Sequence, residues 1–433
     1  MADTAPEAST ASVQRPRSLL ESIAFGVETI KTRYEIREDT GFALDVFLPA
    51  ATAVRARALQ ARGLGGGDTV DLKQAVRWVY IPLLEEALGT RCDPEGGLRV
   101  TLTCTDAAGE GAWLAERVRQ QAGRLPKRKK VYGQRRHPKA PMVAAADMVA
   151  STRVIEELAA LEDAAFLALC PPAAASLAPP AAAVGLTLSA TRTPFFLGGR
   201  YTKLRRGIPQ SPWFIDGERR GDGSVEERLA ETLLPALRCA SATFSSAGRE
   251  DVDVRMLGAG RPWALECLDC GAAPPEPAAC RALEQDVNAR QAGAIGITGL
   301  RVLSRAEVAA MRVEDGDKQK SYVAVCWAPQ PLTEAQLALL RSTENLMLQQ
   351  QTPIRVLHRR ANLVRPRTIM QMEAEALPGT SCFLLGLRTQ EGTYIKEFVH
   401  GDLGRTKPSL GDLLGLPAVT ILYLDVIDIH MQF

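Results

Sequence analysis

The residues most able to do chemistry in this 433-residue chain lie in one stretch, residues 245–262, which places three acids and three arginines between glycines. Glycine permits a tight backbone course that a residue with a Cβ resists. A carboxylate on such a loop is favoured in its ionised form when guanidinium groups lie nearby. Gly248-Arg249-Glu250-Asp251 therefore suits a charged carboxylate directed into a cleft, although the same pattern also suits a surface turn with solvated ion pairs.

Two segments combine basic residues in a way that suits contact with RNA. In residues 194–206 the basic groups are interleaved with a tyrosine, which suits a phosphate track with a stacking surface. Residues 351–367 hold six basic or potentially basic groups, and arginine forks match phosphate geometry. The predicted contacts are Arg200, Tyr201, Lys203, Arg205 and Arg206 in the first segment and Arg355, His358, Arg359, Arg360, Arg365 and Arg367 in the second. A basic hairpin and a solvated basic loop are the respective alternatives.

A third basic run, residues 117–139, contains ten Lys or Arg and no acid. The net charge is only +2, from 52 basic and 50 acidic residues, so a nucleic-acid surface must come from segregated charge. Such a run favours phosphate contact or a nuclear-import signal, and both nuclear and cytoplasmic residence stay open. Further predicted RNA contacts are Lys127, Arg128, Lys129 and Lys130 in this run, and Arg405 and Lys407 near the end of the chain.

Cysteine spacing gives little support for a metal. Cys267-Leu-Asp-Cys270 is the one metal-like spacing, but a structural zinc needs four ligands, and only Cys280 lies near. The nine cysteines, an odd number, are scattered and do not suggest a disulfide framework. We therefore expect neither a metal nor such a framework.

Composition and hydrophobic patterning predict a chain of several parts with mixed helices and strands. We expect a disordered tail over residues 1–15, an α/β accessory domain over 16–170, a Pro/Ala linker over 171–185 and an α+β catalytic domain over 186–433. Capping boxes at Ser224, Ser304 and Thr333 predict three helix starts. Helices are expected over 19–34, 71–88, 147–169 and 394–400, and strands over 46–50, 98–104, 186–190, 261–266, 295–302, 320–327, 381–388 and 419–429. We expect a soluble intracellular protein, because no apolar run reaches eighteen residues and no signal pattern opens the chain.

Gly248-Arg-Glu-Asp251 resembles the Gly-Arg-Thr-Asp motif of pseudouridine synthases, in which the aspartate is the essential catalytic residue. Continued by Val252-Asp-Val-Arg255, it is similar to the "Pus ten" family of archaeal and eukaryotic tRNA pseudouridine synthases, which carry a THUMP-type accessory domain. Three motifs precede it in the family's order, namely Gly199-Arg-Tyr201, Ile208-Pro-Gln-Ser-Pro-Trp213 and Asp216-Gly-Glu-Arg219. Gly392-Thr-Tyr-Ile-Lys396 resembles the superfamily signature Gly-Thr-Tyr-Ile-Arg, with the lysine expected in this family.

The resemblance implies a curved, mainly antiparallel mixed sheet with flanking helices and an RNA-binding cleft, together with a THUMP-like N-terminal domain. It implies an isomerase that converts uridine to pseudouridine in the TΨC arm of tRNA, at positions 54 and/or 55, with no cofactor, no metal and no membrane. Asp251 would be the ionised nucleophile or base, and Lys396 would hold it charged. Tyr322 would stack on the uracil and could serve in proton transfer, while Arg249 could occupy the space that the base vacates. Segment 351–367 resembles the family's thumb region.

Two alternatives differ from this interpretation. An RNA-binding or processing adaptor without activity would use the same basic surface, but it would not need Asp251, Tyr322 and Lys396. A base-modifying enzyme of another class, such as a methyltransferase, needs a glycine-rich cofactor loop after a strand. The nearest such loop, residues 63–67, follows an Ala/Arg-rich run that is not typical of a strand.

Overall fold

The computed structural model describes residues 19–63, 71–106, 162–169, 184–312, 318–358 and 360–431. The chain divides into two compact units, Met1–Thr193 and Pro194–Phe433. The predicted tail, most of the predicted linker and the whole basic run of residues 117–139 fall outside the described residues, as does the greater part of the helix predicted over 147–169. No helix in the described ranges is both long and apolar enough to cross a membrane.

The N-terminal unit is built around a three-stranded sheet in the order β1-β2-β3, with β1 parallel to β2 and β3 antiparallel to it. Its described elements are α1 (Leu19–Arg33), β1 (Phe42–Phe47), α2 (Ala50–Ala61), α3 (Leu72–Leu88), β2 (Leu98–Asp106), α6 (Asp163–Leu169) and β3 (Val184–Arg192). Apolar side chains of α1 and α3, among them Ile30 and Leu84, are buried with Phe42, Leu98 and Val100 of the sheet. The strand predicted over 46–50 in fact ends at Phe47, since Pro49 caps the start of α2.

Strand β3 belongs to the N-terminal unit, so the boundary between the two units lies later than the predicted start of the catalytic domain. We expected residues 186–193 to open the catalytic domain, but β3 pairs with β2 along its whole length, from Val184 opposite Asp106 to Arg192 opposite Leu98. The division between the two units therefore falls after Thr193, later than the predicted start at 186. The position of this boundary depends on pairing between strands that are far apart in the sequence, which local composition cannot indicate.

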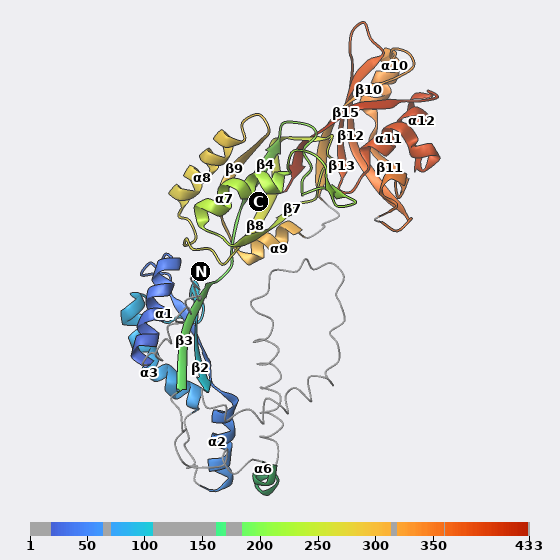
Figure 1. The fold of residues 1–433 in the computed structure, drawn as a ribbon. Helices are drawn as coiled ribbons and strands as arrows, with labels where there is room; N and C mark the ends of the chain where they lie inside the picture. Colours follow the sequence, from blue (N-terminus) through green and yellow to red (C-terminus); the bar gives the residue numbers. More distant parts are fainter. Residues whose placement is uncertain are drawn as a thin grey trace, which may run out of the picture. The chain divides into compact units, whose positions relative to one another are not determined.

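The C-terminal unit contains a ten-stranded sheet in the order β14-β11-β12-β13-β10-β15-β8-β4-β9, with β7 paired to β8 (Figure 1). Its strands are β4 (Phe195–Lys203), β7 (Ser241–Ser246), β8 (Arg255–Leu268), β9 (Ile295–Leu303), β10 (Gln319–Trp327), β11 (Glu344–Gln351), β12 (Val364–Ala376), β13 (Cys382–Gln390), β14 (Thr406–Lys407) and β15 (Thr420–His430), and a separate hairpin joins β5 (Phe214–Ile215) and β6 (Glu218–Arg219). Among the described strand pairs of this sheet, only β8 and β15 run parallel. The mixed, mainly antiparallel α+β fold predicted from the sequence is confirmed.

Helices pack on this sheet and cover parts of it (Figure 1). They are α7 (Val225–Leu237), α8 (Pro277–Arg290), α9 (Arg305–Arg312), α10 (Glu334–Ser342), α11 (Ile395–His400) and α12 (Leu410–Leu414), with 3-10 turns η1 (Ile354–Val356) and η2 (Gly401–Gly404). The three predicted capping interactions are present at Ser224, Ser304 and Thr333. Because apolar residues recur at helical spacing, α7 buries Val225, Leu229 and further residues of one face in the core around the sheet.

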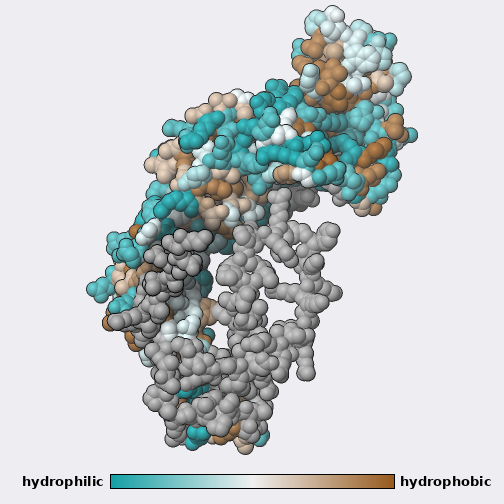
Figure 2. All heavy atoms as spheres, viewed as in Figure 1, coloured by the Kyte–Doolittle hydropathy of each residue, from teal (hydrophilic) through white to brown (hydrophobic). Residues whose placement is uncertain are grey.

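Hydrophilic side chains cover most of the visible middle of the C-terminal unit, and hydrophobic ones gather nearer the part that carries α10 to α12 (Figure 2). Strand β8 lies inside the sheet, where β15, β4 and β7 all pair with it. The acidic motif of residues 248–251 lies in the connection from β7 to β8. The fold therefore places residues 248–251 directly before the central strand β8, next to the hydrophobic core of the unit.

Candidate active site

The connection between β7 and β8 presents two adjacent carboxylates to different surroundings. Glu250 is buried, with a side chain that is 1% exposed, whereas the side chain of Asp251 is 37% exposed. Gly248 begins the turn with a φ of +76°, a conformation that a residue with a Cβ rarely adopts. A Cβ at this position would also lie 3.0 Å from Nζ of Lys320. The glycine thus allows the chain to bury Glu250 and to leave Asp251 accessible.

Glu250 is held by three side chains from the neighbouring strands. Arg261 of β8 donates from Nε to Oε2 of Glu250 over 2.8 Å, and the Tyr201 hydroxyl of β4 donates to the same oxygen over 2.9 Å. Nζ of Lys203 lies 3.5 Å from the other carboxylate oxygen, Oε1. Burial and the Glu250 charge raise the pKa of Tyr201 well above its ordinary value, and burial lowers the pKa of Lys203 although Glu250 opposes this. The buried Glu250 carboxylate is therefore the shared partner of Arg261, Lys203 and the Tyr201 hydroxyl.

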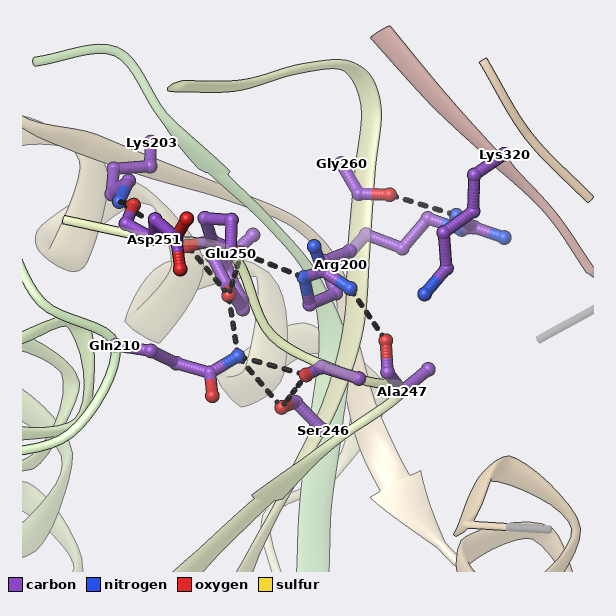
Figure 3. A network of polar contacts seen from close by, with 12 residues as sticks. Arg200, Lys203, Gln210, Ser246, Ala247, Glu250, Asp251, Gly260 and Lys320 are labelled. Atoms are coloured by element: carbon purple, nitrogen blue, oxygen red, sulfur yellow. Dashed lines mark hydrogen bonds and ion pairs between the residues drawn. The ribbon is translucent and has the colours of Figure 1, made fainter. Parts of the chain in front are cut away.

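Two of these side chains, together with Gln210, also hold the backbone of the loop. Lys203 donates from Nζ to the Asp251 carbonyl over 2.9 Å, and Arg261 donates from Nη1 to the Ala247 carbonyl over 2.6 Å. Gln210 donates from Nε2 to the Gly248 carbonyl over 3.0 Å (Figure 3). Because donors from β4, β8 and residue 210 hold three of its carbonyls, the loop has little freedom to move Asp251.

The Asp251 carboxylate meets two cations that come from distant parts of the chain. Oδ2 of Asp251 lies 3.0 Å from Nη1 of Arg355 and 3.3 Å from Nζ of Lys396. Lys396 also donates to both oxygens of Asp253, over 2.8 and 2.7 Å. Burial acts to raise the pKa of Asp253, but the hydrogen bond and charge of Lys396 outweigh it and the pKa is lowered. The structure thus brings Asp251 and Lys396 together, as the sequence led us to expect.

The other two predicted catalytic residues lie differently. Tyr322, on β10, is half-buried, and burial raises its pKa to about 12, so its phenol stays protonated at neutral pH. Its charged neighbours are Arg261 and Glu391, and no hydrogen bond joins it to Asp251 in the described part of the chain. Arg249 is exposed and makes no hydrogen bond or ion pair with any described residue.

The predicted RNA surface in residues 194–206 is largely wrong. Tyr201 and Lys203 are fully buried, because alternate residues of β4 face the core and meet Glu250 there. Arg200 donates to the carbonyls of Gly260 and Met431, and Arg206 pairs with Asp425. Among these five predicted contacts, Arg205 is the one that is exposed. Buried side chains cannot offer a stacking surface or a phosphate contact.

The segment of residues 351–367 divides in a similar way. Arg355 contacts Asp251 and Glu397, Arg365 donates to Thr352, and Arg367 donates to the Pro366 carbonyl. His358 and Arg360 are exposed, and Arg360 donates to the Tyr394 hydroxyl over 3.1 Å. Farther along, Arg405 donates to the Thr352 carbonyl and to Asn362, whereas Lys407 is exposed. Arg359, Lys127, Arg128, Lys129 and Lys130 lie outside the described residues.

Sequence reasoning missed four residues of this site: Glu250 and Arg261 as a buried ion pair, Asp253 as the closer partner of Lys396, and Glu397 as the partner of Arg355. The charges were visible in the sequence, but nothing local separates a buried carboxylate from a solvated one. Only the first of these pairs carried a signal, since Glu250 and Arg261 share one short glycine-rich stretch.

A cysteine cluster lies at the ends of α7 and β8. Cys239 and Cys270 form a disulfide, which we did not predict, and the sulfur of Cys267 lies in the same group. The two bonded cysteines are 31 positions apart, and the fold alone brings them together. In the described residues this is the one group of cysteines, histidines and acids spaced for a metal. Two of its three sulfurs are joined in the disulfide, so only Cys267 keeps a free thiol, whereas a structural zinc takes four ligands.

Comparison with known proteins adds a family to this geometry. The sequence model of the family described as "Pus10, C-terminal" matches residues 196–430. The chain is 35% identical to the tRNA pseudouridine synthase Pus10 of Xenopus laevis over 412 residues, which cover 92% of this chain and 75% of the relative. It is 34% identical to the Homo sapiens protein of that name, covering 92% and 73% of the two chains. It is 36% identical to the Methanothermobacter marburgensis protein, covering 54% and 60%.

Solved structures give a weaker likeness. A Cbf5–Nop10–Gar1 complex matches with a TM-score of 0.29 and 16% identity, over 52% of this chain and 47% of that one. The family model and the sequence relatives carry the assignment. The family model and the relatives named tRNA pseudouridine synthase define the chain as an isomerase of the pseudouridine synthase class. Within that class, the chain belongs to the Pus10 family.

Proposed function

We propose that this protein converts uridine to pseudouridine in the TΨC arm of tRNA, at position 54, 55 or both, with Asp251 as the catalytic group. The observation that carries the proposal is the setting of Asp251, which is partly exposed on an anchored loop and contacts two cations. The three relatives compared above are named tRNA pseudouridine synthase, which supports tRNA as the substrate. Positions 54 and 55 rest on the family resemblance.

The residues of the site suit the steps of such an isomerisation. The target uridine leaves its stack, as enzymes that act on a base require. Asp251 then acts as nucleophile or base while the bond from C1′ to N1 breaks, the uracil turns, and a bond from C1′ to C5 forms. C5 loses its proton and N1 gains one, so the reaction balances without a cofactor. Lys396 and Arg355 keep the Asp251 carboxylate charged and oriented.

Two further residues complete the proposed site. Tyr322 would present a neutral phenol ring to the uracil, and its raised pKa suits a group that donates or relays a proton rather than one that ionises. Arg249, which is exposed beside Asp251, would fill the place that the flipped base leaves. Neither role requires a metal.

We propose that RNA contacts those of the predicted basic residues that are exposed and form no ion pair in the described residues. These are Arg205, His358, Arg360 and Lys407. Arg359 and the run of Lys127 to Lys130 stay predictions from the sequence. The N-terminal unit would serve as the THUMP-like accessory domain.

The experiment that tests the activity is tritium release from a tRNA transcript with 5-tritiated uridine, because isomerisation replaces the hydrogen at C5. We expect the wild-type protein to release tritium and Asp251→Asn to release none while it still binds tRNA. Asp286→Asn, which changes a surface aspartate on α8, is the matched control and should keep full activity. Transcripts that retain uridine at only 54 or only 55 identify the position.

Each other outcome has a definite meaning. Equal release by the wild type and Asp251→Asn would show that Asp251 is not the catalytic group. Tight tRNA binding without release by either protein would favour the adaptor interpretation.

A further inference from the structure

The family signature attributes the cation beside the catalytic aspartate to Lys396, but the shorter contact to Asp251 comes from Arg355. Nη1 of Arg355 lies 3.0 Å from Oδ2 of Asp251, whereas Nζ of Lys396 lies 3.3 Å from it. Lys396 makes its shorter contacts, at 2.7 and 2.8 Å, with the two oxygens of Asp253. Lys396 therefore contacts two carboxylates, and its shorter contacts are with Asp253.

Arg355 itself is held from behind by a buried carboxylate. Nε of Arg355 donates to Oε1 of Glu397 over 2.7 Å, and Nη2 lies 3.4 Å from Oε2. The Glu397 side chain is 2% exposed, and Arg355 is its ion-pair partner among the described residues. A buried carboxylate of this kind keeps its partner in place, because separating the two would leave an unpaired charge in the core.

The Arg355 guanidinium thus contacts two carboxylates at the same time. Its Nε edge faces Glu397 of α11, and Nη1 faces Asp251 of the β7–β8 loop. The planar fork of arginine allows this, because its donors point in fixed and different directions. A lysine offers one compact ammonium and cannot reproduce both contacts with the same orientation.

We propose that Arg355 is a positioning residue: held by Glu397, it fixes the orientation of the Asp251 carboxylate toward the reacting base. The proposal rests on the catalytic role of Asp251 given above. It differs from the role that the sequence suggested for Arg355, which was a phosphate contact. It also gives the two adjacent residues Lys396 and Glu397 one target, since the first reaches Asp251 directly and the second reaches it through Arg355.

The variant Arg355→Lys separates positioning from RNA contact. It keeps a positive charge for Glu397, so the buried carboxylate stays paired, but it loses the fork that spans to Asp251. In single-turnover assays with saturating tRNA we expect the rate constant of bound tRNA to fall by about 10- to 100-fold, since small errors in placing a reacting group cost up to roughly that much. The Kd for tRNA and its dependence on salt should stay as in the wild type.

Two results would overturn the proposal. A wild-type rate constant with a weaker Kd would make Arg355 a phosphate contact, because lysine keeps the charge but lacks the fork that matches phosphate geometry. A wild-type rate constant with an unchanged Kd would show that Asp251 needs no help from it. Arg290→Ala, which removes an exposed arginine paired with Asp286 on α8, is the control for loss of a surface ion pair.

Glu397→Gln tests whether the effect passes through Arg355. Alone it should also slow the bound reaction, and added to Arg355→Lys it should slow it little further, since both act on one contact. If Arg355→Lys unfolds, the double variant Arg355→Gln with Glu397→Gln removes both charges, and the same outcomes decide the question. Asp251→Asn is measured in parallel. If it retains activity, the proposed function fails; if it is inactive while Arg355→Lys reacts at the wild-type rate, only the positioning role fails.

Discussion

Glu250→Gln tests most directly whether the buried charges beneath the Asp251 loop stabilise the C-terminal unit. Glu250 is the anion that faces Arg261 and Lys203, whose side chains are 1% and 0% exposed. Glutamine keeps the size of the side chain and one carbonyl oxygen, but it removes the charge. The two cations then stay in the core without their shared partner, although Lys203, whose pKa burial already lowers, can release its proton and reduce the cost.

The expected loss of stability follows from this burial. Removing one partner of a buried ion pair costs about 3–5 kcal/mol, because the remaining charge is left without compensation. A domain of about 150–250 residues loses roughly 2–4 °C in its melting midpoint for each kcal/mol. The transition of the C-terminal unit, residues 194–433, should therefore fall by about 6–20 °C, nearer the lower end if Lys203 deprotonates.

Differential scanning calorimetry of the whole chain measures this shift, and urea unfolding provides an independent value. The matched control is Glu218→Gln, whose partner Arg220 and own side chain are exposed, at 47% and 75%. Such a surface pair is worth about 1 kcal/mol at most, so the control should melt close to the wild type. If Glu250→Gln melts as close to the wild type as the control does, Glu250 is not the buried counter-charge that we describe.

Two other predictions concern salt and pH. Arg360→Ala should lower the slope of log Kd for tRNA against log salt by about 1 in filter-binding assays, and an unchanged slope would remove this residue from the RNA surface. For Asp425, burial acts to raise the pKa, but Arg255 and Arg206 outweigh it and the pKa is lowered. Its stabilising contribution is thus complete above the unfolded pKa, near about 4, and is lost as the pH falls through the folded value. Asp425→Asn should lower the melting midpoint at neutral pH, and this difference should shrink below about pH 4; a difference that does not change with pH would contradict the pairing.

Predictions that depend on neighbours in the sequence are confirmed. The capping boxes at Ser224 and Thr333 begin α7 and α10, because a cap needs only residues three positions apart. The alternating strand over 320–327 forms β10, and the Cys382–Gln390 strand lies where a strand was expected. The motif around Asp251 also contains enough local information to indicate the family, which the match over residues 196–430 confirms.

Predictions that depend on which face a residue presents met with less success. Lys203 and Arg205 are both basic and two positions apart, yet one is fully buried and the other is exposed. Strand alternation places residues 201 and 203 on the same side of the strand. Only the packed sheet shows that this side faces the core, where both side chains contact Glu250. The basic residues predicted to form one surface over residues 194–206 are therefore mostly buried or paired within the fold, and only Arg205 among them is exposed.

By itself, the sequence determined the α+β class, several helix starts, about half of the strands and the motif that indicates the family, since each depends on short-range periodicity, capping or a short signature. The tertiary structure alone decided that β3 pairs with the N-terminal sheet, that Glu250 is buried while Asp251 is accessible, and that Arg355 faces Asp251. The physical reason is that burial and ion pairing depend on contacts between segments that are distant in the sequence. Asp251, Arg355 and Lys396 acquire their relation only when β8, η1 and α11 pack together, and no local pattern in the chain records that packing.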